Sequence, residues 1–248
     1  MSGHSKWATI RRKKEKTDAA RGKVFTKLIK EISIAARMGG GDETANPRLR
    51  TAIAAGKAAN MPAANIDRAV KKGTGELPGV VYEEVVYEGY SPGGAALLIN
   101  TMTDNRNRTV GEIRHLLGKY GGSLGETGSV NWMFERKGMV TVAKEGADED
   151  SLLELLIDYE VEDITEEEDG FEIVCAPEAL EDVKQALEKA EKQIVSAELT
   201  MLPQTTVKLE GSQAKTTLNL MGLLDDHDDV QNIYSNFDID EDLLDAAE

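Results

Sequence analysis

The sequence has one cysteine, three histidines and no long apolar run, and each of these absences excludes a class of protein. Cys175 has no partner for an intramolecular disulfide bond or a CxxC site, which fits a reducing compartment and favours the cytoplasm. No segment reaches the roughly 20 apolar residues that cross a bilayer, so we expect no membrane partner. The first residues also lack the apolar block of a secretory signal. They could imitate an organelle transit peptide, but Glu15 and Asp18 argue against one.

Sequence patterns for catalysis are missing as well. There is no Walker A motif, no GxSxG and no HExxH. Cys175 alternates with Phe171 and Ile173, so we expect its thiol to face a core and to be inert. The run "DDHDD" at 225–229 has side chains that suit a divalent cation, but neighbouring residues on a helix point in different directions, and a solvated helix end is the commoner interpretation. We therefore predict no enzyme, no metal site, no cofactor and no small-molecule substrate.

Charge is divided unevenly along the 248 residues. Residues 1–79 carry 17 Lys and Arg against seven Asp and Glu, whereas residues 80–248 carry 12 against 38, giving the formal net charge of −16. Such asymmetry is typical of a basic module attached to an acidic body, and it points to a polyanionic partner. The acidic body would repel the same partner.

The basic segment, residues 1–79, shows the pattern of a small helical domain. Residues 1–16 are polar and basic without an apolar period, so we expect a mobile arm. A helix is predicted from Thr17 to the glycines at 39–41, with its lysines on an exposed stripe opposite the apolar face. A second helix begins at the Asn46-Pro47 cap. A third begins after Pro62 and ends with Gly73 at its C′ position, which opens a linker.

The remainder predicts an α+β organisation. Residues 80–137 show two strands and a helix, and residues 138–203 follow the order βαββαβ of a ferredoxin-like domain. Residues 204–240 supply a strand, a helix and a strand that could complete the first unit, so that the ferredoxin-like domain is inserted into a discontinuous middle domain. Residues 241–248 look like an acidic tail.

The basic segment predicts contacts with nucleic acid. A polyanion with closely spaced phosphates releases counterions when Lys and Arg neutralise it, which gives affinity without reading a sequence. Trp7 can stack on a base, or it can pack onto the helices. A lysine-rich helix face is often only a solvated surface. Here, however, the rest of the chain is acidic, and solubility alone does not explain why the positive charges are concentrated in one segment. The basic track consists of Lys6, Arg11, Arg12, Lys13, Lys14 and Lys16 in the arm and of Lys23, Lys27 and Lys30 on the helix, and all of these except Lys16 are the predicted phosphate contacts.

A second candidate contact lies in "TDNRNRTVGEIRH", residues 103–115. Arg106 and Arg108 stand just ahead of a helix, where free amides and the helix dipole favour an anion. Pairing of either arginine with a neighbouring carboxylate is an equally good interpretation.

Four stretches together resemble one protein family. They are "GHSKWATIRRKKEKTDAARGKVFTKLIKEI", "GGGDETANPRLRTAIAAGKAANMPAANIDRAVKKG", "YEGYSPGGAALLI" and "TDNRNRTVGEIRHLLGKYGGSLGETGSVNWMF". They are similar to the YebC/PmpR family, which includes the mitochondrial translational activator of cytochrome oxidase subunit one. The resemblance runs from Gly3 to about residue 240. It implies a helical N-terminal domain and two α+β domains, the last inserted into the middle one, and it adds Arg21 to the predicted backbone contacts.

The resemblance implies two possible targets. Bacterial members are mostly described as DNA-binding transcriptional regulators, whereas others look like translation factors that bind RNA at the ribosome where proline-rich nascent chains stall. Both functions require nucleic acid, so the predicted contacts keep the same role. An alternative of another class is an acidic protein-interaction scaffold, in which the basic arm serves only solubility.

Overall fold

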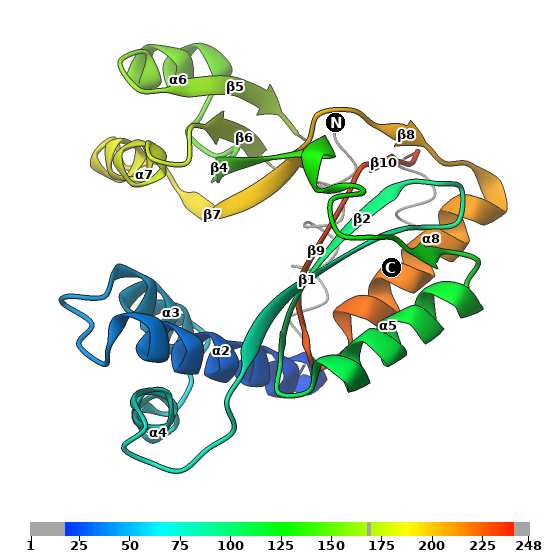
Figure 1. Cartoon of the computed structure of the whole chain (residues 1–248). Helices are drawn as coiled ribbons and strands as arrows, with labels where there is room; N and C mark the ends of the chain where they lie inside the picture. The colour runs from blue at the N-terminus through cyan, green and yellow to red at the C-terminus, as the bar shows by residue number, and fades with distance from the viewer. Residues whose placement is uncertain (1–17, 168–169, 241–248) are drawn as a thin grey trace. The chain divides into compact units, whose positions relative to one another are not determined.

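The computed structural model describes residues 18–167 and 170–240, and the chain forms two compact units. One unit contains the chain up to Met133 together with the segment from Thr205 onward, and the other is Phe134–Gln204. The first unit begins with helices and continues as an α+β layer (Figure 1). No helix within the described ranges is both long and apolar enough to span a membrane.

Three helices open the first unit: α2 (Asp18–Gly39), α3 (Pro47–Ala58) and α4 (Ala63–Thr74). Asn46 caps α3 by accepting a hydrogen bond from the amide of Leu49 at 3.1 Å, and its own amide group donates to the carbonyls of Ala35 and Gly40 near the end of α2. A buried cluster that includes Ile32, Leu49, Ile53 and Ile66 joins the three helices. The asparagine and this core fix the turn between α2 and α3.

The end of α4 differs from the sequence prediction. Gly73 lies inside the helix, and the left-handed C-cap is Gly75, with φ of 82°. A Cβ on Gly73 would lie 2.3 Å from the carbonyl oxygen of Ser33. The glycine at 73 therefore allows α4 to approach α2 closely, a requirement that the sequence pattern attributed to a helix end.

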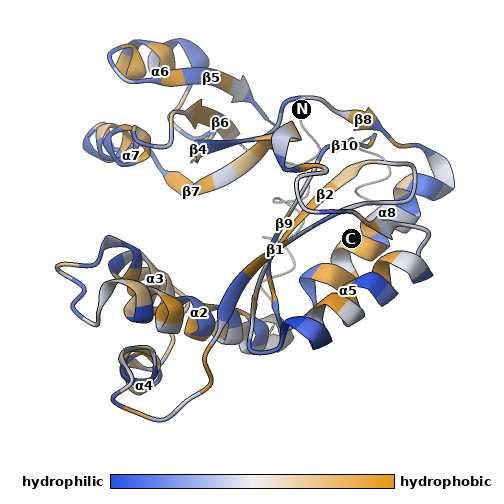
Figure 2. Cartoon of the chain, viewed as in Figure 1, coloured by the Kyte–Doolittle hydropathy of each residue, from blue (hydrophilic) through white to orange (hydrophobic). Residues whose placement is uncertain are grey.

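The α+β layer of the first unit combines two segments that are far apart in the sequence. Its four-stranded sheet has the order β3-β1-β2-β9, and β9 pairs antiparallel with β2. A buried cluster with Ile99, Ile113, Leu117, Leu218 and Ile233 joins this sheet to α5 and α8, whose apolar and hydrophilic sides Figure 2 shows. The elements are β1 (Glu83–Tyr90), β2 (Ala96–Thr103), α5 (Arg106–Lys119), β3 (Ser123–Leu124), the 3-10 helix η1 (Asn131–Met133), β8 (Val207–Lys208), α8 (Gly211–Asp225), β9 (Val230–Ser235) and β10 (Phe237–Asp238).

The second unit is an antiparallel sheet of order β5-β6-β4-β7 with two helices, which is the ferredoxin-like arrangement. Its elements are β4 (Phe134–Ala143), α6 (Glu149–Leu156), β5 (Val161–Glu166), β6 (Gly170–Cys175), α7 (Leu180–Lys189) and β7 (Ile194–Pro203). The fold-class prediction is confirmed, including the insertion. The first strand begins four residues before the expected Gly138, because Phe134–Lys137 pair with β7 across the sheet, and the local sequence does not reveal that partner. Cys175 is fully buried in the core, as expected.

Candidate nucleic-acid interface

Most of the predicted contacts lie outside the described residues. Lys6, Trp7, Arg11, Arg12, Lys13 and Lys14 precede Asp18, and the side chain of Arg21 is also outside the described part. These seven residues stay predictions. The structure places the other five: Lys23, Lys27, Lys30, Arg106 and Arg108.

The three lysines of α2 meet a run of aspartates that links α8 to β9. Lys23 lies 2.7 Å from Asp226, Lys27 lies 3.0 Å from Asp225, and Lys30 lies 2.7 Å from Asp229, each distance joining the ammonium nitrogen to a carboxylate oxygen. Their spacing of four and three residues puts the lysines on one side of the helix. The exposed fraction of the lysine side chain falls from 46% to 20% to 7% along this series. We call residues 225–229 the acidic loop.

Lys30 corrects one sequence prediction. It was expected on an exposed stripe, but it is buried, and its ammonium donates to the carboxylate of Asp229 and to the carbonyls of Asp228 (2.8 Å) and Met102 (3.2 Å). The same ammonium lies 5.4 Å from the centre of the Tyr82 ring. Helical periodicity predicts the direction in which Lys30 points but not which segment covers it. In the structure the acidic loop covers Lys30. A phosphate could reach Lys30 only by disrupting these contacts.

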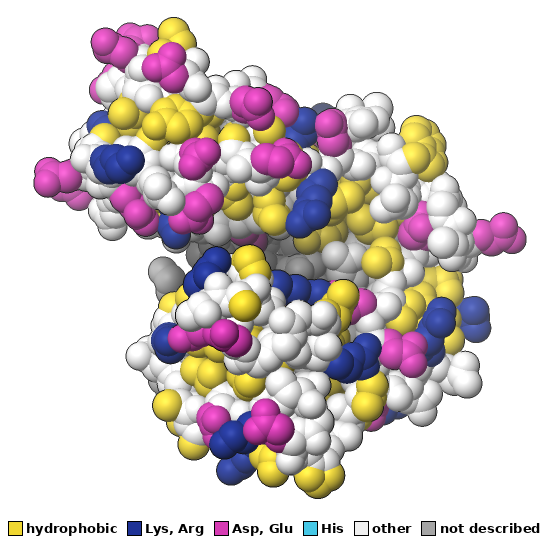
Figure 3. Space-filling model, turned by 60° about the vertical axis from the view of Figure 1, so that its left-hand side comes forward, with side chains coloured by type: hydrophobic (Ala, Val, Ile, Leu, Met, Phe, Trp, Pro, Cys, Tyr) yellow, Lys and Arg dark blue, Asp and Glu magenta, His cyan; other side chains and the backbone are white. Residues whose placement is uncertain are grey.

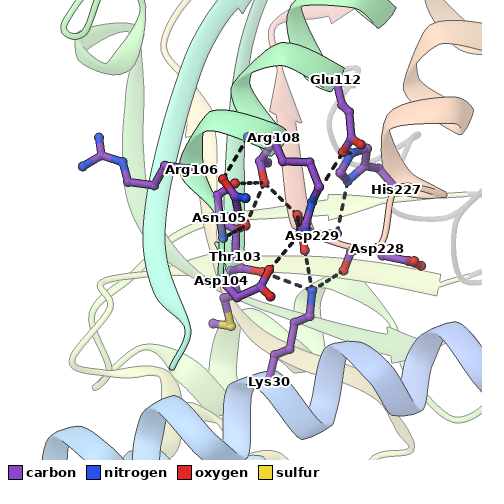
Figure 4. A network of polar contacts seen from close by, with 12 residues as sticks. Lys30, Thr103, Asp104, Asn105, Arg106, Arg108, Glu112, His227, Asp228 and Asp229 are labelled. Atoms are coloured by element: carbon purple, nitrogen blue, oxygen red, sulfur yellow. Dashed lines mark hydrogen bonds and ion pairs between the residues drawn. The ribbon is translucent and has the colours of Figure 1, made fainter. Parts of the chain in front are cut away.

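Asp229 is the centre of this polar network (Figure 4). Its two carboxylate oxygens accept hydrogen bonds from Lys30, from the guanidinium of Arg108 and from the hydroxyl of Thr109, all at 2.7 Å. Burial opposes ionisation of this carboxyl, but the three donors outweigh it and hold the pKa of Asp229 well below its ordinary value. The aspartate is therefore a buried anion shared by α2 and α5.

The two arginines at the start of α5 have different environments. Asn105 caps the helix by accepting from the amide of Arg108 at 3.1 Å. The Arg108 guanidinium bonds Asp229 and Asp104 (2.8 Å), and these hydrogen bonds raise its pKa. Pairing with carboxylates, one of the two interpretations of the sequence, thus describes Arg108. Arg106 is exposed and points away from the network (Figure 4), and its side chain interacts with Tyr87 rather than with a carboxylate.

His227 completes the network. Its Nδ1 accepts a hydrogen bond from the amide of Asp229 at 3.1 Å, and its Nε2 lies 2.9 Å from a carboxylate oxygen of Glu112. Glu112, His227 and Asp229 lie close enough together to bind a cation. However, Asp229 is already paired with Arg108 and Lys30, so the positive charges beside it come from the chain's own side chains. The network is therefore an internal bridge between helices.

Sequence reasoning missed two features of this unit. It did not pair the aspartates of the acidic loop with α2, because the two segments are about 200 residues apart. It also gave no role to Trp132, which is exposed in the structure. A tryptophan in a polar stretch of sequence was the only signal of it.

Comparisons with known proteins point to one family over nearly the whole chain. Residues 5–76 match the TACO1/YebC protein N-terminal domain, and residues 82–237 match the TACO1/YebC second and third domain. A probable transcriptional regulatory protein of Desulforapulum autotrophicum is 54% identical over 246 residues, 99% of this chain and 100% of its own. One from Geobacter sulfurreducens is 56% identical over 239 residues, 96% of each. The crystal structure of a conserved hypothetical protein from Aquifex aeolicus has a TM-score of 0.81 at 48% identity, covering 90% of this chain and 93% of that one. This chain belongs to the TACO1/YebC family.

Proposed function

We propose that this protein is a nucleic-acid-binding regulator of gene expression, and more specifically a DNA-binding transcriptional regulator. Its relatives are named probable transcriptional regulatory proteins, which supports the role in transcription. The observation that carries the proposal is the division of charge. Residues 134–204 contain six Lys and Arg against 21 Asp and Glu, a net charge of −15, which is nearly all of the chain's −16. In Figure 3, acidic side chains are spread over the ferredoxin-like unit. A polyanion is repelled there and attracted to the basic first segment.

The described cations fit contacts to phosphates more than to bases. Lys23 is half-exposed with one exposed carboxylate partner, and Arg106 is exposed. By contrast, Lys30 is buried, and Arg108 is held by two carboxylates, one of them buried. Long, flexible side chains at the surface neutralise a backbone without reading base edges. We therefore expect Lys23, Lys27 and Arg106 to act with Lys6, Arg11, Arg12, Lys13, Lys14 and Arg21.

The test is a salt titration of binding to duplex DNA. About six phosphate contacts give a slope of log affinity against log salt near −5. Reversing the charges of Arg11, Arg12, Lys13 and Lys14 to Glu removes four contacts and should abolish measurable binding at physiological salt.

The matched control reverses four cations elsewhere, Lys144, Lys184, Lys189 and Lys215, so that the net charge changes equally. This control should retain the slope of the parent protein. Equal loss in both variants would contradict a local interface, and absence of binding by the parent at low salt would overturn the proposal. Crosslinking in cells with sequencing of the bound nucleic acid then identifies the target. Promoter fragments are expected, whereas ribosomal RNA would assign the protein to translation.

A further inference from the structure

Trp132 is an exposed aromatic side chain in the short helix η1 of the first unit, at the end of the loop 125–131. The residue is 66% exposed, and it is the only aromatic among the large apolar residues exposed in the described part of the chain. Its indole N–H donates to the carbonyl of Ser129 at 3.1 Å, so the single polar group of the ring is satisfied within the loop. The indole therefore has no unsatisfied polar group, and its apolar faces are open to the solvent.

A buried carboxylate builds the loop that holds this ring. Glu88 on β1 is 5% exposed, and its two oxygens accept hydrogen bonds from the amides of Gly128 (2.6 Å), Val130 (2.7 Å) and Asn131 (2.8 Å). Burial alone would raise the pKa of Glu88, but these three amides outweigh it and lower the pKa. Since Val130 is also fully buried, the backbone just before Trp132 is tied both to the sheet and to the core. The position of the indole is thus fixed before any ligand arrives.

The surroundings of Trp132 distinguish between possible ligands. Aromatic anchors of protein interfaces lie within apolar patches that exclude water around them. The exposed residues that precede Trp132 in its own segment are Glu126, Thr127 and Asn131, and residues 125–131 expose no large apolar side chain. An exposed aromatic face in a polar segment suits a ligand that is flat, apolar on its faces and polar at its edges. An unpaired nucleobase has these properties, and single-strand binding proteins use exposed aromatics in this way.

We propose that Trp132 is a stacking site for one unpaired nucleobase, in single-stranded DNA or RNA, and that Glu88 is the residue that positions it. This proposal deepens the nucleic-acid-binding function and depends on it. It adds a base contact on the middle part of the chain to the phosphate contacts expected at the N-terminus. It also predicts a preference that phosphate contacts alone do not give, because the stacked bases of a duplex offer no free face.

The experiment uses the full chain with Trp7 replaced by Phe, so that Trp132 is the only tryptophan. The probes are 12-nucleotide oligoadenylate, the same length of oligodeoxyadenylate, and the duplex of that DNA strand with its complement. We expect both single strands to quench the intrinsic fluorescence and the duplex to leave it unchanged. Comparison of the two single strands tells RNA from DNA as the better source of the base.

Substitutions then test the role of the ring. Trp132→Ala should weaken binding of single strands about 5- to 150-fold, since alanine replacement of a stacked aromatic has effects of this size. Trp132→Phe should restore most of that loss, and both variants should bind the duplex as the parent does. Glu88→Gln removes acceptor capacity from the loop and should weaken single-strand binding although the indole is still present. Asn131→Ala, in the same loop, is the control that should change nothing.

Three outcomes would overturn the proposal. They are binding of both single strands by Trp132→Ala as tightly as by the parent, fluorescence that stays unchanged at saturation, and an equal loss of duplex binding in Trp132→Ala. If the parent binds none of the three probes at low salt, the proposed function itself fails. These results are distinguishable, because only the last one removes binding from the unsubstituted protein.

Discussion

Asp229 is the residue on which the charges of the first unit converge. Removing one partner of a buried ion pair leaves the other charge uncompensated, which typically costs about 3–5 kcal/mol. Asp229→Asn would leave the ammonium of Lys30 with two carbonyl acceptors and no carboxylate. We therefore expect it to lower the free energy of unfolding by about 3–5 kcal/mol at pH 7, measured by urea denaturation. Asp228→Asn changes an exposed side chain of the same loop and should stay within about 0.5 kcal/mol of the parent.

The pH dependence of this loss has a definite sign. The pKa of Asp229 is depressed in the folded state, so its ionisation contributes stability that is fully present well above the ordinary pKa of 3.8. That contribution is lost as the pH falls below 3.8 toward the folded pKa. The difference in unfolding free energy between the parent and Asp229→Asn should therefore shrink on acidification below about pH 4. A difference that stays constant from pH 7 to pH 3 would contradict the anionic role of Asp229.

At the scale of single residues, the sequence predicts positions better than partners. Helical spacing placed Lys23, Lys27 and Lys30 on one side of α2, which the structure bears out. It could not predict that Lys30 is buried, because the covering loop lies about 200 residues away. Local pattern carries the periodicity of a helix, whereas burial of a charge depends on long-range packing.

At the scale of elements, the acidic loop competes with any phosphate for α2. Asp225 and Asp226 pair with Lys27 and Lys23, and these two pairs are more exposed than the pair of Lys30. Exposed ion pairs contribute about 0–1 kcal/mol each and weaken with salt. A nucleic acid that brings several phosphates can therefore displace the two carboxylates, while the inner pair keeps α2 in place.

The double variant Asp225→Asn, Asp226→Asn should bind duplex DNA more tightly than the parent. It frees two cations, so the salt slope should steepen by up to about 1.8. Stability should fall only slightly, because the lost pairs are partly solvated. Glu181→Gln, Glu188→Gln removes two carboxylates beside Lys184 in the ferredoxin-like unit and serves as the control for net charge. An equal gain of affinity in both variants would show that the acidic loop has no special role.

The boundaries of elements followed from the sequence where the signal is local. Asn46 and Pro47 mark the start of α3 as expected. The start of α5 was placed too late, because Arg106 and Arg108, expected just ahead of the helix, lie in its first turn behind the Asn105 cap. No local signal predicts that β9 lies beside β2, because the two strands are more than 100 residues apart and local periodicity does not depend on the pairing partner. The function of Gly73 was misjudged for the same reason, because its closest neighbour is the backbone of α2.

At the scale of the whole molecule, the division of charge follows directly from the amino-acid composition. It leads to a prediction about the rate of association with nucleic acid. The ferredoxin-like unit carries a net charge of −15, so its field opposes the approach of a polyanion even where it makes no contact. Fields between exposed charges act over roughly 10 Å at 0.1 M salt and further at lower salt. The carboxylates of this unit should therefore slow association without changing what the bound nucleic acid touches.

Amide replacement of six exposed carboxylates in this unit tests that division of roles. The positions are Glu145, Glu154, Asp158, Glu160, Glu178 and Glu191. The variant should associate with duplex DNA faster than the parent at low salt, and the two rates should converge as salt screens the field. The dissociation rate should stay unchanged, because that rate reports contacts made in the complex. Stopped-flow measurements at several salt concentrations separate the two rates, and a change confined to dissociation would place these carboxylates at the interface itself.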